Sequence, residues 1–250
     1  MRFKTIGNPD DPRALFIHAM FTDSESFSAL AEYLIEDYFV IMPTLDGHDT
    51  QNENSDFISY DDEADKILAY LQEMGIKELD FILGTSLGAI IAFEVYRGHK
   101  VHINKVFLDG GPFFNFGSLL QKIMMKKFWS ICSKTRQNPG FAAIKIDKLF
   151  PGLGSQMCHV CCHMSKKSVS NLAHACYSYS LPELGEAEQK AITFIYGTKE
   201  PALMCSRRLK KYKYSSFIRK AGYSHCGYLL SHPDEYAEML KESPHNLNQG

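Results

Sequence analysis

Gly84-Thr85-Ser86-Leu87-Gly88 is the stretch of this sequence that decides the fold. It follows the apolar run LDFIL and leads into the apolar segment AIIAFEV, a pattern that predicts a buried strand followed by a buried helix. A serine on a sharp turn between a strand and a helix is typical of a G-x-S-x-G nucleophile elbow. The glycines suit such a turn because larger side chains two residues from the serine would collide. We predict that Ser86 is a nucleophile; the alternative is a glycine-rich turn with a serine cap.

Composition indicates an ordinary globular protein. The chain has 250 residues, enough for one sizeable α/β domain with an inserted subdomain. Hydrophobic residues make up 45% and charged residues 22%, which argues against disorder, and the net charge of -2 argues against a general nucleic-acid binder. No segment predicts a signal peptide or a membrane span. The seven cysteines then predict free thiols in a reducing compartment, and we expect a cytoplasmic protein.

Strand and helix patterns alternate along the chain. Buried strands are expected over residues 13–18, 38–42, 79–83, 105–108, 191–196 and 214–218. Helical spacing of apolar residues is found over residues 24–36, 60–74, 89–95 and 226–241, the last interrupted near Pro233. This alternation predicts the α/β class, with a mostly parallel sheet covered by helices on both faces. Functional residues of such sheets lie at the carboxyl ends of the strands.

The segment from Phe113 to Glu183 breaks the alternation and predicts several short helices without strands. We therefore expect a core made of residues 1–112 and 184–250, with residues 113–183 inserted as a helical lid over the strand ends. Basic residues dominate the lid and face a single acid, Asp147: Lys122, Lys126, Lys127, Lys134, Arg136, Lys145, Lys148, Lys166 and Lys167. They form either a solvated outer face or a surface that attracts an anionic substrate or an acidic partner.

A serine nucleophile needs a base and a carboxylate that orients the base. His225 lies in a loop between the last predicted strand and the final helix, where it could reach the elbow, so we predict that it is the base. Glu200 is the one acid in the loop after the strand that ends at Tyr196, and it precedes a helix that Pro201 can start. Glu200 is the predicted acid, and Asp109, at the end of the preceding strand, is the alternative.

Two backbone amides are needed to stabilise the oxyanion of the reaction. Leu87, the residue after the nucleophile, supplies one of them in this prediction. The second comes from the loop after the first buried strand, with Met20 as the first choice and Phe21 as the second. His18 and His48 are expected to be structural hydrogen-bonding residues near this loop.

At these residues the chain resembles the α/β-hydrolase superfamily, and the resemblance extends from Leu15 to about Leu240. The segments that carry it are HAMF at 18–21, PTLDGH at 43–48, the elbow at 84–88, GTKE at 197–200 and GYSH at 222–225. Two positions depart from the family pattern: Ala19 stands where glycine is usual, and Glu200 where aspartate is commoner. The resemblance implies an α/β-hydrolase fold with residues 113–183 as its cap.

The sequence thus predicts an esterase-like serine hydrolase that cleaves a small ester or thioester through Ser86, His225 and Glu200. The alternatives are an acyltransferase, a carbon–carbon bond hydrolase or a non-catalytic ligand receptor on this fold. We expect a small-molecule substrate, anionic or acyl-bearing, no cofactor and no nucleic-acid partner. Six residues suit an apolar acyl group, and equally ordinary core packing: Phe21, Phe113, Phe114, Phe116, Met124 and Met125.

A cluster of thiols and imidazoles invites a metal interpretation. Cys158, His159, Cys161, Cys162 and His163 lie within six consecutive positions, and these side chains are good zinc ligands. The distant second pair of ligands that a zinc site requires is not evident in the sequence. We therefore predict buried or pocket-lining thiols and no metal site.

Overall fold

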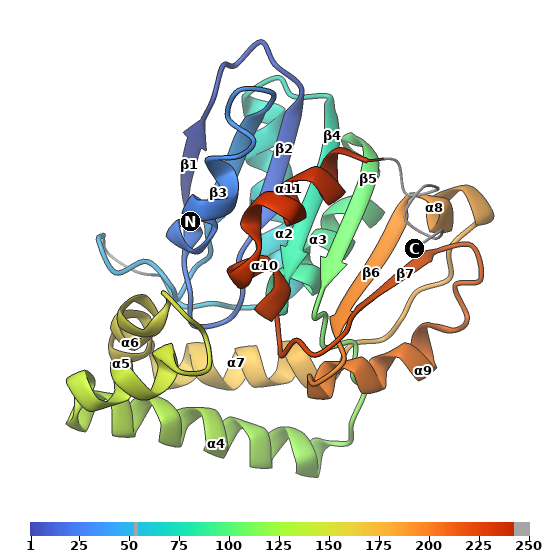
Figure 1. The fold of residues 1–250 in the computed structure, drawn as a ribbon. Helices are drawn as coiled ribbons and strands as arrows, with labels where there is room; N and C mark the ends of the chain where they lie inside the picture. The colour runs from blue at the N-terminus through green and yellow to red at the C-terminus, as the bar shows by residue number, and fades with distance from the viewer. Residues whose placement is uncertain (53–54, 243–250) are drawn as a thin grey trace.

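The computed structural model describes residues 1–52 and 55–242, and its centre is a seven-stranded sheet (Figure 1). The strand order is β1-β3-β2-β4-β5-β6-β7, with β1 antiparallel to β3 and every other neighbouring pair parallel. The strands are β1 (Arg2–Ile6), β2 (Arg13–Ile17), β3 (Phe39–Thr44), β4 (Glu78–Thr85), β5 (His102–Asp109), β6 (Ile192–Gly197) and β7 (Ser216–Lys220). The predicted α/β class and mostly parallel sheet are confirmed.

Both faces of the sheet are buried, because successive side chains of a strand point to opposite faces. In β2, Leu15 and Ile17 belong to the hydrophobic cluster under α2 and α3, whereas Ala14 and Phe16 belong to the cluster under α1, α10 and α11. Figure 1 shows these two groups of helices on opposite sides of the sheet. Their bounds are α1 (Ser28–Ala31), α2 (Tyr60–Glu73), α3 (Leu87–Arg97), α10 (Gly227–Ser231) and α11 (Pro233–Lys241).

Several predicted boundaries differ from the structure. The helix expected over residues 24–36 is only the 3₁₀ turn η1 (Ser24–Phe27) followed by the short α1, and Asp23 rather than Ser24 caps it. Strand β3 runs through Pro43 and ends at Thr44. Proline is tolerated there because the pairing with β2 ends at Ile41, so Pro43 pairs with β1 alone. The final helix is interrupted before Pro233, as expected.

Residues 113–183 contain four helices and, among the named elements, no strand. The helices are α4 (Ser118–Gln137), α5 (Pro139–Asp147), α6 (Gly154–His163) and α7 (Lys166–Tyr177). Figure 1 shows α7 lying between the sheet and α4, with α5 and α6 at one end of α4. That these helices form a separate cap stays a prediction. Short elements complete the fold between β5 and β7: α8 (Glu186–Lys190), η2 (Pro201–Cys205) and α9 (Ser206–Leu209).

The chain direction places the candidate site at one edge of the sheet. From β2 the chain passes to β3 on one side, while β4 lies on the other side, so the strand order reverses between β2 and β4. Ligands of open parallel sheets bind at the carboxyl ends of the strands beside such a reversal. Ile17 pairs with Gly84 there, and Thr85 pairs with Asp109. Within the described residues, no helix is long and apolar enough to cross a membrane.

Candidate active site

Ser86 occupies a strained turn between β4 and α3. Its φ is 53° and its ψ -114°, a conformation that L-residues with side chains rarely adopt. The two glycines of the motif allow this turn because the backbone approaches closely. A Cβ on Gly84 would lie 2.2 Å from the carbonyl oxygen of Gly88, and one on Gly88 would lie 2.0 Å from that of Ile17. The predicted steric reason for the glycines is therefore present in the structure.

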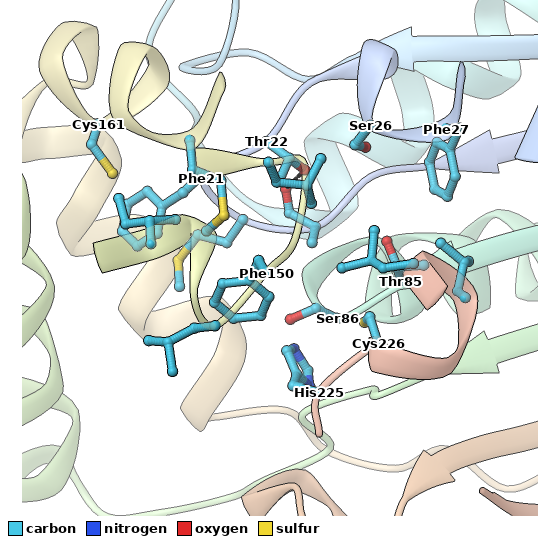
Figure 2. A pocket seen from close by; sticks show the side chains of 18 of the residues that line it. Phe21, Thr22, Ser26, Phe27, Thr85, Ser86, Phe150, Cys161, His225 and Cys226 are labelled. Carbon is cyan, nitrogen blue, oxygen red and sulfur yellow. Dashed lines mark hydrogen bonds between the residues drawn. The ribbon is translucent and has the colours of Figure 1, made fainter. Parts of the chain in front are cut away.

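His225 and Glu200 meet beside this serine. The Nδ1 atom of His225 lies 2.5 Å from Oε2 of Glu200, the spacing of a hydrogen bond in which the carboxylate accepts. Oε1 of Glu200 accepts a second hydrogen bond, from the backbone N–H of Gly197 at 2.6 Å. The Glu200 side chain is fully buried, whereas the His225 side chain is 29% exposed. Figure 2 shows the Ser86 hydroxyl directed towards the ring of His225.

Asp109, the alternative acid, has a different partner. Its Oδ2 accepts a hydrogen bond from the hydroxyl of Tyr236 at 2.9 Å. Burial, and then the negative charge of nearby Glu200, raises the pKa of the Asp109 carboxyl to about 7. Asp109 is therefore harder to ionise than an ordinary carboxyl group, and the hydrogen bond of His225 Nδ1 goes to Glu200. The structure thus pairs His225 with Glu200, and Asp109 with Tyr236.

The loop after β2 is held in place by a buried histidine. Nδ1 of His18 lies 2.8 Å from the carbonyl oxygen of Ala19, and Nε2 accepts a hydrogen bond from the N–H of Leu45 at 3.0 Å. Burial lowers the pKa of His18, so the ring stays neutral, with its proton on Nδ1 towards Ala19 and the lone pair of Nε2 accepting from Leu45. His18 is therefore the structural hydrogen-bonding residue that the sequence predicts.

The oxyanion candidates belong to two segments, the start of α3 and the loop after β2. Leu87 is the first residue of α3, where backbone N–H groups have no partner within the helix. Met20 and Phe21 are the central residues of a turn closed by the N–H of Thr22 on the carbonyl oxygen of Ala19, at 3.3 Å. Phe21 has a φ of 68°, and Ala19 is not among the positive-φ residues. The left-handed position of this loop is therefore Phe21, and an alanine at 19 is tolerated.

Backbone strain is concentrated around one cavity. The described residues include four non-glycine residues with positive φ, and three of them, Phe21, Ser86 and Cys226, line the same cavity. Its volume is about 430 Å³, and Figure 2 shows Ser86 and His225 at its wall. Strained backbone of this kind persists where surrounding structure holds it and is frequent at functional sites. The cavity therefore coincides with the residues that the sequence predicts to be functional.

The walls of the cavity come largely from residues that the sequence analysis did not single out. Apart from Phe21, the six residues suggested for an acyl group do not line it. Phe113 is fully buried and packs against Phe93 and Phe194 in the core. The distal wall is instead formed by side chains of α4, α5, α6 and the α5–α6 loop, namely Phe128, Ile146, Phe150, Leu153, Met157 and Cys161.

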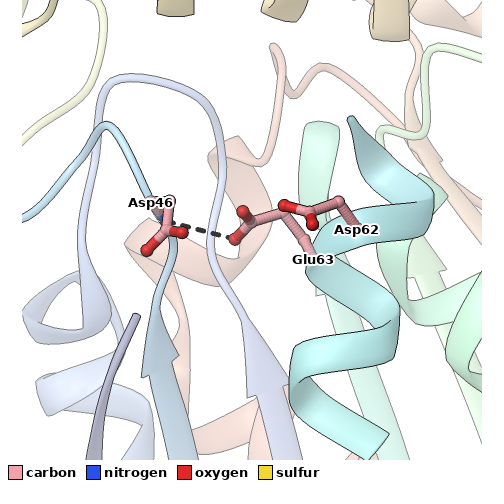
Figure 3. A group of neighbouring side chains, drawn as sticks. All are labelled: Asp46, Asp62 and Glu63. Atoms are coloured by element: carbon pink, nitrogen blue, oxygen red, sulfur yellow. Dashed lines mark hydrogen bonds between the residues drawn. The ribbon is translucent and has the colours of Figure 1, made fainter. Parts of the chain in front are cut away.

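Two groups of side chains carry potential metal ligands. In the cysteine and histidine segment of residues 158–163, Cys158 and Cys161 are buried free thiols, and within the described part of the chain no three side chains of this segment bring ligand atoms to metal-binding spacing. Asp46, Asp62 and Glu63 do place carboxylate oxygens within 4.8 Å of one another (Figure 3).

Two ammonium groups, those of Lys66 and of the Met1 N-terminus, already pair with carboxylates of this group. Nζ of Lys66 lies 2.6 Å from Asp46 and 2.5 Å from Asp62. One oxygen of Glu63 accepts from the N–H of Asp46 at 3.1 Å, and the other is buried without a hydrogen bond. The group is an ion network with Asp46 and Glu63 buried and Asp62 and Lys66 partly exposed, and none of these residues lines the cavity.

Comparison with known families decides the class of the chain. A sequence model of the Alpha/beta hydrolase family matches residues 14–239. This protein belongs to the α/β-hydrolase family. The match spans the core strands β2 to β7, both loops beside Ser86 and all four helices of residues 113–183. No curated protein sequence matches the chain.

Solved structures of α/β hydrolases share the fold. An alpha/beta hydrolase family protein from Desulfitobacterium hafniense is 18% identical, with a TM-score of 0.74 over 96% of this chain and 98% of its own. A thermophilic esterase from Thermogutta terrifontis is 14% identical, with a TM-score of 0.75 over 99% and 94%. The type II thioesterase BorB of the borrelidin biosynthetic cluster is 13% identical, with a TM-score of 0.72 over 96% of each chain.

Proposed function

We propose that this α/β hydrolase is a serine hydrolase that cleaves carboxylic esters or thioesters with an apolar acyl group. The observation that carries the proposal is the hydrogen bond between His225 and Glu200 beside Ser86, at the wall of an apolar cavity. Membership of the family supports a hydrolase, and esterases and thioesterases share the fold. A binding protein would have no need of a serine, a histidine and a carboxylate in this arrangement.

In the first half of the proposed reaction, Ser86 attacks the substrate carbonyl carbon while His225 takes the hydroxyl proton on Nε2. Glu200 holds Nδ1 of the ring, which fixes the tautomer and stabilises the imidazolium that forms. The carbonyl oxygen becomes an oxyanion, and the amides of Leu87 and Met20 donate hydrogen bonds to it. The dipole of α3 adds to this stabilisation, because the helix N-terminus faces the same position.

In the second half, the tetrahedral intermediate collapses and the C–O or C–S bond of the substrate breaks. The leaving alcohol or thiol receives the proton from His225, and the acyl group stays on Ser86 as an ester. A water molecule then gives its proton to His225 and attacks the acyl carbon. Collapse of the second intermediate releases the carboxylic acid and returns the proton to Ser86.

The cavity favours an acyl-bearing substrate over an anionic one. Among the described residues, no Asp, Glu, Lys or Arg lines it, and its distal wall is made of apolar and sulfur-containing side chains. Burying a charged group there would be costly, whereas burying an acyl chain is favourable. We propose that helices α4 to α7 act as the cap over this acyl site, because α4, α5 and α6 supply the distal wall.

Active-site labelling tests the proposal. A fluorophosphonate probe should label the wild-type protein and leave Ser86→Ala unlabelled, and a pulse of p-nitrophenyl ester should leave acyl-enzyme on the wild type alone. Ser28→Ala is the matched control, since Ser28 lies on α1 outside the cavity. Failure of folded wild-type protein to label or to turn over esters of any chain length would reject the proposal.

A further inference from the structure

We propose that the outer surface of α4 and α5 docks on anionic lipid bilayers and passes an apolar substrate from the bilayer into the cavity. Docking is independent of the proposed function, whereas delivery of the substrate rests on it. We define the α4–α5 surface by its exposed apolar residues and lysines between Ser118 and Leu149.

Apolar side chains are unusually exposed on the α4–α5 surface. Of the eight large hydrophobic side chains that are more than half exposed in the described part of the chain, five lie here. They are Leu119 (73%), Ile123 (51%), Phe141 (55%), Ile144 (62%) and Leu149 (67%). Leu119 and Ile123 are four positions apart on α4, and Phe141 and Ile144 are three apart on α5, so each pair lies on one face of its helix. Apolar stripes that no other element covers mark interaction surfaces.

The charge of the same surface is one-sided. Six exposed lysines lie among the apolar residues, and none forms an ion pair with a described residue: Lys122, Lys126, Lys127, Lys134, Lys145 and Lys148. The single acid between residues 118 and 149, Asp147, is occupied, because its Oδ1 accepts from the N–H groups of Gly152 and Gly154. Lysines around exposed apolar side chains are complementary to anionic headgroups above an acyl layer.

A second copy of the chain fits this surface poorly. In a two-fold dimer the same patch meets itself, so the six lysines of one copy would face the six of the other. Asp147 is the one acid between residues 118 and 149, so it could offset at most one of the six lysines in each copy and most of the repulsion would be uncompensated. An anionic bilayer offers negative headgroups to the lysines and an apolar interior to the exposed apolar side chains.

The cavity connects with this surface. Ile131 on α4 and Leu149 after α5 both line the cavity, and they are 38% and 67% exposed. Apolar side chains therefore continue from the cavity wall to the outside of the α4–α5 surface. An acyl chain that leaves a docked bilayer can follow them without crossing bulk water, which would otherwise impose the cost of hydrating the chain. Figure 1 shows α4 on the side of α7 away from the sheet, so a flat surface can approach it.

Vesicle binding tests the proposal with the full chain. We would compare vesicles of phosphatidylcholine with vesicles that contain 30% phosphatidylglycerol, by flotation and by the emission of Trp129, the one tryptophan of the chain and a residue of α4. The variant Phe141→Ser/Lys145→Glu removes one apolar and one basic side chain. Met74→Ser/Lys77→Glu is its matched control, since both residues are exposed on the core.

The proposal predicts at least tenfold stronger binding to the phosphatidylglycerol vesicles, with a blue shift of Trp129 emission. Phe141→Ser/Lys145→Glu and Ile144→Ser should each weaken it at least fivefold, and the control and Ser86→Ala should bind like wild type. Equal binding to both vesicles, no binding, or equal losses in variant and control would overturn it. A dimer in solution that Phe141→Ser/Lys145→Glu dissociates would also overturn it. So would binding of poly-L-glutamate that is as strong as vesicle binding and is unchanged in Ile144→Ser.

The two proposals fail in different ways. A wild-type protein that binds the vesicles but is not labelled by the fluorophosphonate probe would reject the hydrolase and keep the docking surface. A wild-type protein that hydrolyses soluble esters but binds phosphatidylglycerol vesicles no better than phosphatidylcholine vesicles would reject the docking surface and keep the hydrolase.

Discussion

Gly110 lies directly against the imidazole ring of His225. A Cβ on Gly110 would be 2.7 Å from Cε1 and 2.8 Å from Nδ1 of the ring, and 3.1 Å from Oε2 of Glu200. Gly110 follows β5 and has a φ of +63°. The backbone of this residue is therefore one wall of the slot that holds the hydrogen-bonded pair His225 and Glu200.

Gly110→Ala should lower kcat/KM at least about 100-fold, because a displacement of about 1 Å at a catalytic group has that effect. The left-handed φ adds a loss of about 1–2 kcal/mol in the free energy of unfolding. Gly222→Ala is the matched control: it has a φ of +84° but nothing within 4 Å of its Cβ, so it should lose stability and keep activity. Steady-state kinetics and chemical unfolding of both variants check this, and equal activity losses would contradict it.

Exchange of each acid for its amide distinguishes Glu200 from Asp109. Glu200→Gln should reduce kcat about 10³- to 10⁴-fold, because the amide no longer stabilises the imidazolium. Asp109→Asn should change kcat by less than about tenfold, since its amide oxygen still accepts from Tyr236. Burst kinetics with p-nitrophenyl esters measure both. A larger loss in Asp109→Asn would assign the role of the acid to Asp109 instead.

Glu63 should make stability depend on pH. Burial, and then the charge of Asp46, raises the pKa of Glu63 to about 7, above its ordinary value of 4.5. The folded state therefore binds a proton that the unfolded state has lost, so the free energy of unfolding falls as pH rises from 4.5 to 7. Glu63→Gln removes this penalty and should stabilise the protein by about 1–3 kcal/mol at pH 8 and by little at pH 5.

Denaturant unfolding at pH 5 and pH 8 measures this difference. Glu36→Gln, at an exposed position, is the control and should be neutral at both pH values. A Glu63→Gln variant that is less stable than wild type at pH 8 would show that ionised Glu63 stabilises the fold through Lys66.

Cys161 should control the acyl-chain preference, since it lines the cavity at a distance from Ser86 (Figure 2). Cys161→Phe fills that end, so turnover of octanoyl esters relative to acetyl esters should fall at least about tenfold, with acetyl turnover retained. Cys162→Phe is the control, because the neighbouring residue of α6 does not line the cavity. Equal chain-length profiles for the two variants would place the acyl group elsewhere.

The catalytic candidates were predictable from sequence because local rules and chain order determine them. Gly84 and Gly88 predict the turn at Ser86, because their missing Cβ atoms make room for the backbone of neighbouring residues. Glu200 could be named because it is the one acid in a loop that must follow a core strand. The choice between Glu200 and Asp109 stayed open, since both follow strands that end at the same edge.

The cavity walls could not be predicted, because they depend on how helices of residues 113–183 pack. Phe113 and Phe150 are similar in sequence terms, yet one is buried in the core and the other lines the cavity. Nothing local distinguishes them. The positive φ of Phe21 could not be predicted either, because glycine is the residue expected in that conformation and Phe21 is bulky. The one hint in the sequence was Ala19, because its side chain takes the place of a glycine and so indicates that another residue of the loop adopts the left-handed conformation.

The three strained residues around the cavity tie the stability of the fold to its chemistry. Glycine at position 21 would relax the backbone, but it would also remove a phenyl ring that is 6% exposed and packs on Phe128, and that loss outweighs the strain. The same change would release the loop that carries Met20 into many conformations. An evolving population that values heat resistance alone would therefore keep this strained residue for its packing, and the shape of the site would be retained with it.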